Sequence, residues 1–144
     1  MSGFVIRNKT DVLNSLNKNV DQIEAAAQFA LGMTGLALER QAKLNANTGV
    51  HGRGTPRIAG TGPGPNRITG ALMGSIQTKL VQGFGNYVAI VGPTMEYAKA
   101  VELGSPRWKS GVKYPYLFPA AEKLSSDGTL NRVFTTNFRM RLKA

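Results

Sequence analysis

Few residues of this sequence have both the type and the spacing that catalysis requires. The chain has no cysteine and a single histidine, His51. The lack of cysteine excludes a thiolate nucleophile and a thiolate metal site, and His51 has no nearby residues that would complete a zinc site or a catalytic triad. Glu96 and Glu102 would point to different faces of a short helix, which does not favour a carboxylate pair. We therefore expect no catalytic, metal-binding or cofactor-binding residue, and a protein that is not an enzyme.

Glu102 still stands out, because it is an acid in a weakly polar segment beside a basic turn. Partly buried acids are more often structural than catalytic. We expect Glu102 to make an ion pair or a helix-cap contact, either with Arg107 or with a neighbouring subunit.

A long glycine- and proline-rich stretch, from about 46 to 67, reads as a flexible loop. Its spaced glycines do not form a phosphate-binding motif, because no strand clearly precedes them and no Gly-Lys-Ser/Thr follows. The loop carries Arg53, Arg57 and Arg67 and no acid. Two interpretations remain open: an arm that carries guanidinium groups to phosphates or acidic partner surfaces, and a solvated linker.

The composition bounds the class of protein. A chain of 144 residues is expected to form a single domain, 1–144. Its formal net charge of +10 favours a polyanionic neighbour, such as nucleic acid or an acidic protein surface. No apolar run approaches the roughly 20 residues that span a bilayer, and Phe4-Val5-Ile6 is too short for a signal-peptide core. We expect a protein made in the cytoplasm that does not contact a membrane.

The N-terminal third is dominated by one helical pattern. Apolar and small residues recur in alternating steps of three and four, at Leu13, Leu16, Val20, Ile23, Ala27, Ala30, Thr34, Ala37, Gln41 and Leu44. The small residues of the second half favour a helix that lies across a sheet, with coiled-coil pairing as the alternative. Because Gly32 and Gly35 each cost about 1 kcal/mol in a helix interior, we expect a bend or a close packing contact there.

The middle of the chain predicts a small antiparallel sheet. Residues 75–82 alternate, with Ile76, Thr78 and Leu80 on one face, and residues 87–91 form a more apolar strand after a glycine-rich turn. Residues 112–118 are a candidate third strand. Because a hairpin alone is marginally stable, helices must cover one of its faces.

The last third predicts short helices. Residues 96–103 place Tyr97 and Val101 on one face, Gly104 suits the position after the helix, and Pro119 suits the first turn of the next one. Residues 130–143 carry apolar residues four apart, which favours a helix, although 138–143 alternate like a strand. The basic residues of this cationic tail are Arg139, Arg141 and Lys143. The predicted fold is therefore α+β, with a long N-terminal helix packed on a small antiparallel sheet, short helices and a C-terminal helix.

One block of the sequence resembles a known family. The pattern YAxxVExG, a variable loop, an aromatic run and a Pro-Ala pair that opens a helix is similar to the tail-completion family of neck proteins of long-tailed (siphovirus-type) phages. The matching positions are Tyr97, Ala98, Val101, Glu102, Gly104, Pro119 and Ala120. Gly70-Ala71-Leu72 and Ser75-Ile76 resemble the family's short helix before its first strand, so the likeness spans roughly 68–124.

The resemblance implies a structural virion protein located in the phage neck. Its subunit would form a homo-oligomeric, hexameric ring that joins the DNA-filled head to the tail and lines the DNA channel. The implied partners are a head-side connector or stopper protein, a tail terminator or tail tube protein, and channel DNA in non-specific contact. Two alternatives remain: a tail-terminator subunit of the same neck, and a free basic nucleic-acid-binding protein.

Overall fold

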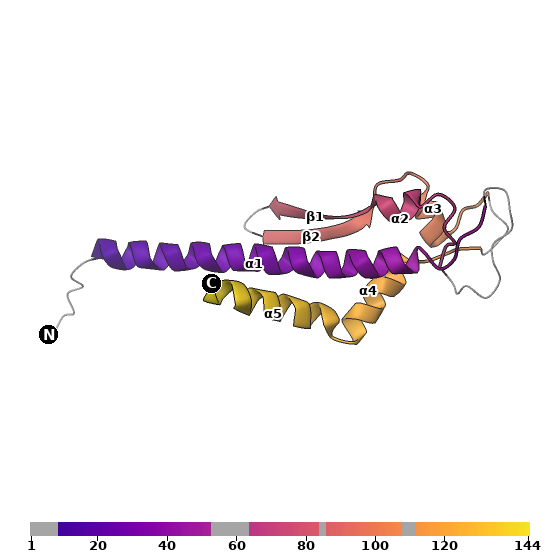
Figure 1. Cartoon of the computed structure of the whole chain (residues 1–144). Coiled ribbons are helices and arrows are strands. Elements are labelled where there is room, and N and C mark those ends of the chain that lie inside the picture. Colours follow the sequence, from indigo (N-terminus) through magenta and orange to yellow (C-terminus); the bar gives the residue numbers. More distant parts are fainter. Residues whose placement is uncertain (1–8, 53–63, 84–85, 108–111) are drawn as a thin grey trace.

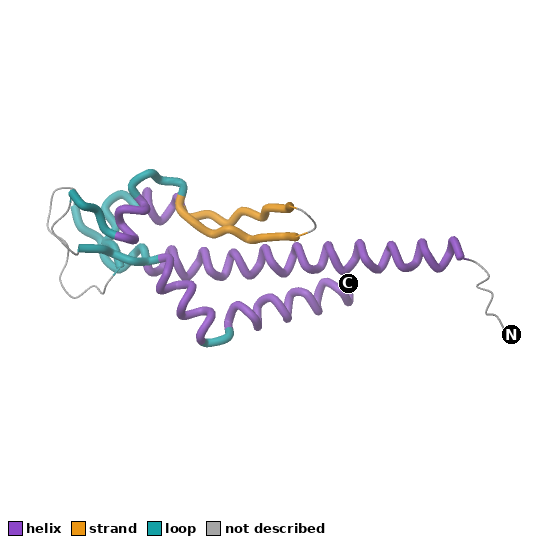
Figure 2. The backbone as a smooth tube through the Cα atoms, turned by 180° about the vertical axis from the view of Figure 1, so that it is seen from behind, coloured by secondary structure: helices purple, strands orange, loops and turns teal. Residues whose placement is uncertain are grey.

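The computed structural model describes residues 9–52, 64–83, 86–107 and 112–144 (Figures 1 and 2). The fold is α+β, as predicted. Its elements are α1 (Lys9–Asn45), α2 (Ala71–Ser75), β1 (Ile76–Gly83), β2 (Asn86–Pro93), α3 (Ala98–Leu103), α4 (Leu117–Ser126) and α5 (Thr129–Lys143). Figure 1 shows α1 as the central element, with the β1–β2 hairpin along one side and α4 and α5 along the other.

Helix α1 confirms the long N-terminal helix that the periodicity predicts. It has 37 residues, which corresponds to about 55 Å. Asp11 in its first turn and Lys43 in its last turn both favour the helix dipole. All of its buried residues are small and lie from Ala26 onward, so none of the described residues buries its first part.

The hairpin packs on α1 at the two helical glycines. Strands β1 and β2 are antiparallel, with pairs running from Ile76 and Pro93 to Gly83 and Asn86. At Gly35 an added Cβ would overlap the Thr78 methyl group, whereas at Gly32 it would meet only Leu80 Cδ1, at 3.4 Å. The expected close contact is therefore confirmed, and Gly35 is the point of closest approach.

The predicted third strand at 112–118 is wrong, because in the described residues the sheet has two strands and α4 begins at Leu117. The backbone donors of this segment are used elsewhere. Tyr114 donates its N–H to the Val101 carbonyl at 2.8 Å. The N–H groups of Tyr116 and Leu117 donate to the Glu102 carboxylate. Because the N–H groups of Tyr114, Tyr116 and Leu117 bond to α3, they are not available to a sheet edge.

The C-terminal tail is helical, so the helix prediction for 130–143 is confirmed over the strand alternative. Helix α5 begins after Gly128, whose φ is +73°, and the Asp127 carboxylate accepts the Thr129 N–H at 2.8 Å. Hydrogen bonding from the side chain of Thr129, and then from its backbone, lowers the pKa of Asp127. The rings of Phe134 and Phe138 stack with centroids 5.8 Å apart, which is the four-residue spacing seen in the sequence.

The core lies where α1, β1 and α4 meet. Its buried residues are Ala42, Ala46, Ile76, Tyr116 and Ala120. Tyr116 is only 1% exposed, and burial, together with the negative charge of Glu102, raises its pKa to about 12. Because these residues come from three elements, the core holds the C-terminal end of α1 to both the hairpin and α4.

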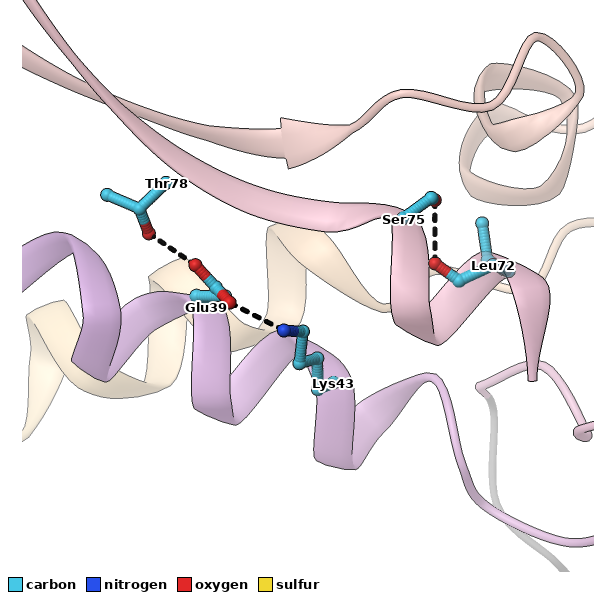
Figure 3. A network of polar contacts seen from close by, with 5 residues as sticks. All are labelled: Glu39, Lys43, Leu72, Ser75 and Thr78. Atoms are coloured by element: carbon cyan, nitrogen blue, oxygen red, sulfur yellow. Dashed lines mark hydrogen bonds and ion pairs between the residues drawn. The ribbon is translucent and has the colours of Figure 1, made fainter.

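A polar link also joins α1 to the hairpin (Figure 3). The Thr78 hydroxyl donates to Glu39 Oε2 at 2.7 Å, and Lys43 forms an ion pair with Glu39 Oε1. The hydrogen bond from Lys43, followed by that from Thr78, lowers the pKa of Glu39, while burial acts in the opposite direction. The ionised carboxylate is therefore the form that fits the folded protein.

This link predicts a loss of stability in acid. Because the folded pKa of Glu39 lies below its usual value of 4.5, its contribution is fully present above that pH and is lost as the pH falls through the folded pKa. We expect Glu39→Gln to reduce the difference in unfolding free energy between pH 7 and pH 3, measured by urea unfolding. The control is Glu122→Gln, which changes an exposed acid of α4; an equal reduction in both variants would contradict the assignment.

Candidate functional site

The basic loop is only partly described. Arg53 and Arg57 lie outside the described residues, so their predicted role stays a prediction. Arg67 is described, and its backbone is fixed: its N–H donates to the Gly49 carbonyl and its own carbonyl accepts the His51 N–H at 3.1 Å. These bonds form a short parallel bridge that brings the two ends of the loop together at the end of α1.

Glu102 is the centre of the resemblance block. Its carboxylate accepts three backbone N–H groups at the start of α4: from Tyr116 at 2.8 Å and Leu117 at 3.0 Å on Oε2, and from Phe118 at 2.8 Å on Oε1. A helix N-terminus leaves such donors unpaired, and its dipole favours a negative charge. The carboxylate therefore joins α3 to α4. Glu102 therefore makes a helix-cap contact, one of the two kinds of contact that we expected. Its partner within the chain is the start of α4, whereas we had expected Arg107 or a neighbouring subunit.

Gly104 allows the chain to leave α3 at this point. Its φ is +86°, and its N–H donates to the Ala100 carbonyl at 2.8 Å. A Cβ on this residue would lie 2.8 Å from the Val112 carbonyl oxygen, which is closer than such contacts occur. Both the backbone angle and the lack of space explain a glycine here.

The other residues of the block divide between core and surface. Ala120 is fully buried, and Pro119 lies in the first turn of α4, as predicted. Val101 packs against the core cluster. Tyr97, which shares the predicted face with Val101, is 46% exposed. Tyr97 and Phe118 of the aromatic run, which is 68% exposed, are large side chains of the block that remain available to a partner.

The cationic tail lies on α5, where Arg139, Arg141 and Lys143 are exposed. Arg141 also has a specific neighbour, because its guanidinium lies 5.9 Å from the centre of the Phe29 ring on α1. This distance is typical of a cation–π contact. Arg141 thus belongs to a surface shared with α1.

That surface is a groove of about 590 Å³ between α1, β1 and α5. Most of its lining is apolar, and it comprises Ala25, Gln28, Phe29, Gly32, Met33, Leu36, Thr78, Leu80 and Arg141. Phe29, Leu36 and Leu80 remain substantially exposed. We call this surface the groove.

The first part of α1, residues 9–25, is exposed at every position. Figures 1 and 2 show it extending beyond the end of the hairpin and beyond the C-terminus of α5. We call it the arm. It bears the first half of the predicted apolar stripe: Leu13, Leu16, Val20 and Ile23, whose exposed fractions lie between 48% and 54%. The packing of this half on the sheet, expected from the periodicity, is not observed.

The sequence indicated the stripe and Glu102 but not their surroundings. The groove has no local sequence signal, since Phe29, Leu80 and Arg141 belong to three distant segments. In the described ranges no three His, Cys, Asp or Glu side chains gather as they would around a metal ion. Among the helices described, none combines the length and the apolarity needed to cross a membrane.

Comparison with known proteins finds no match: no family model, no curated protein and no solved structure resembles this chain at a significant level.

Proposed function

We propose that this chain is a structural subunit of the neck of a long-tailed phage, acting in tail completion. It would assemble into a ring, hexameric by the resemblance, between the DNA-filled head and the tail. Its neighbours would be a head-side connector or stopper protein on one side and a tail terminator or tail tube protein on the other.

The observation that carries the proposal is the uncovered arm. A helical segment such as the arm has little stability of its own in water, because most helical stability comes from packing an apolar face. The arm has such a face, and nothing in the described chain covers it. We expect neighbouring subunits to cover this apolar face, which favours a role in assembly.

The resemblance block supports the same proposal. The Val-Glu-x-Gly segment and the helix opened by Pro-Ala are linked by the three hydrogen bonds to Glu102. This contact gives a physical reason for the two parts of the pattern to occur together. The block would then act as a rigid base at the C-terminal end of α1, next to the basic loop.

The basic residues would contact the DNA in the channel or acidic partner surfaces. Arg53, Arg57 and Arg67 of the loop, with the cationic tail, would face DNA or acidic partner surfaces. A channel lining must not hold DNA tightly, so contacts with phosphates would be weak and independent of sequence. Each neutralised phosphate would contribute about −0.9 to the slope of log affinity against log salt.

Quantitative mass spectrometry of purified, nuclease-treated virions from the source system tests the proposal. We expect the protein in the particle, at the copy number of other neck-ring proteins. Its absence from particles that contain their other neck proteins would overturn the proposal.

The cationic surface of α5 favours one second candidate, a free nucleic-acid-binding protein. Such a protein would bind duplex DNA as a monomer, with an affinity that falls steeply as salt rises. A salt titration with purified protein separates the two, because we expect a neck subunit to bind weakly at every salt concentration. Tight binding by the monomer would favour the second candidate.

A further inference from the structure

The apolar stripe of the arm and the groove face opposite sides of α1. At 3.6 residues per turn, the step from Val20 on the stripe to Phe29 in the groove is about two and a half turns. Both residues are substantially exposed, at 52% and 40%. The molecule thus presents a convex apolar stripe on one side and an apolar groove on the other.

A single chain cannot bring these two surfaces together. Val20 and Leu36 belong to the same helix and lie about 24 Å apart along it. The stripe therefore cannot fold back into its own groove while α1 is intact. Two copies can make the contact that one copy cannot.

We propose that the arm of one copy docks in the groove of the next copy. Leu16, Val20 and Ile23 would lie against Phe29, Leu36 and Leu80 of the neighbour. The inference rests on the proposed function, because it specifies how the subunits of the proposed ring contact one another. The contact can also be tested without any virion.

The charges of the two surfaces are complementary. The chain as a whole has a net charge of +10, whereas residues 9–25 have three acids against two lysines. Glu24 is one turn from Val20 on the same side of the arm. The groove in turn is bordered by the cation Arg141. A docked arm would place Glu24 near this cation, which favours a second copy over a cationic or nucleic-acid partner.

The proposed contact is heterologous, because it joins two different surfaces. Such a contact repeats from copy to copy and generates a closed ring, or an open filament if the rotation does not close. A symmetric contact between two stripes would instead stop at a dimer. Because the stripe and the groove are two different surfaces of one subunit, the contact would repeat from copy to copy and could build the ring.

Cysteine cross-linking of the purified full chain tests the contact, because the chain has no native cysteine. Val20→Cys and Leu36→Cys are purified separately and treated with a short bis-maleimide, alone and mixed. Ile23→Cys with Phe29→Cys is a second pair that allows for a shift in register. We expect the mixture of at least one pair to form covalent dimers at least tenfold faster than either variant alone.

Two outcomes would overturn the proposal. Cross-linking of Val20→Cys alone as fast as in the mixture would show a symmetric contact between stripes. No cross-link from either pair, at the highest concentration at which the protein stays soluble, would show that arm and groove do not meet.

A charge-matched pair of variants provides an independent measurement. Leu16→Glu with Val20→Glu places two acids on the stripe, whereas Asn14→Glu with Gln22→Glu places two acids on the far side of the same arm. In sedimentation velocity we expect the stripe variant to remain monomeric and the control to assemble like the parent. Circular dichroism checks that both remain helical. Equal assembly of the two variants would contradict the docking.

These experiments separate the two proposals. Cross-linking through arm and groove by a protein that is absent from virions would support the contact and reject the neck function. A protein present in virions without this cross-link would support the neck function and reject the contact.

Discussion

Replacing Glu102 with alanine is expected to lower the free energy of unfolding by about 2–3 kcal/mol. The substitution leaves three backbone N–H groups without their acceptor at the start of α4. A buried donor without a partner costs about 1–3 kcal/mol, and because this site is half-buried, water replaces part of the loss. Losing the negative charge at a helix N-terminus adds a smaller term. Urea unfolding followed by circular dichroism measures the effect.

Two further variants test this explanation. Glu102→Gln retains one carbonyl oxygen but no charge, so we expect about half of the loss. Glu96→Ala removes an exposed acid from the segment before α3, and we expect a change within about 0.5 kcal/mol. A Glu102→Ala protein as stable as Glu96→Ala would show that the three hydrogen bonds do not hold α4.

The two helical glycines are expected to respond to alanine with opposite signs. An added Cβ at Gly35 overlaps the Thr78 methyl group and lies 3.4 Å from Ala89 Cβ. Thr78 is β-branched and bonded to Glu39, so it cannot easily rotate away. Overpacking costs about 1–3 kcal/mol and the gain in helix propensity is about 1 kcal/mol. We expect Gly35→Ala to destabilise the protein by about 1–2 kcal/mol.

Gly32→Ala is the matched substitution one turn earlier. Its Cβ would meet only Leu80 Cδ1, at an ordinary contact distance of 3.4 Å. The gain in helix propensity should then dominate, and we expect stabilisation by about 0.5–1 kcal/mol. Urea unfolding of both variants under the same conditions measures the difference. A change of the same sign in the free energy of unfolding of both variants would show that packing of the hairpin does not distinguish the two glycines.

The elements that sequence predicted well are those with strong local periodicity. Steps of three and four predicted α1, and alternation predicted the strand that begins at Ile76, because both patterns follow from backbone geometry. The segment 112–118 shows the limit of such patterns. Its pattern indicated an extended strand, but α4 begins at Leu117, and the N–H groups of Tyr114 and Tyr116 bond to α3. No local pattern reports where a donor finds its acceptor.

The candidate site shows the same division. Glu102 could be singled out because an acid in a weakly polar helix needs a partner. Its partners could not be predicted, because they begin 14 residues further along the chain and meet it only when α3 and α4 pack. The predicted face of Tyr97 and Val101 shows a related limit: spacing identifies a face, but Val101 packs against the core whereas Tyr97 remains 46% exposed.

The sequence by itself determined the helices, the hairpin, the excess of positive charge and the apolar stripe of α1. Only the tertiary structure decided that the stripe is at least partly covered from Ala27 to Gln41 but exposed in its first half and at Leu44, and that Phe29, Leu80 and Arg141 form one groove. The physical reason is that periodicity depends on neighbours along the chain, whereas burial depends on which distant elements reach a given face. Here the arm extends past the ends of the hairpin and of α5, and it remains exposed (Figure 1).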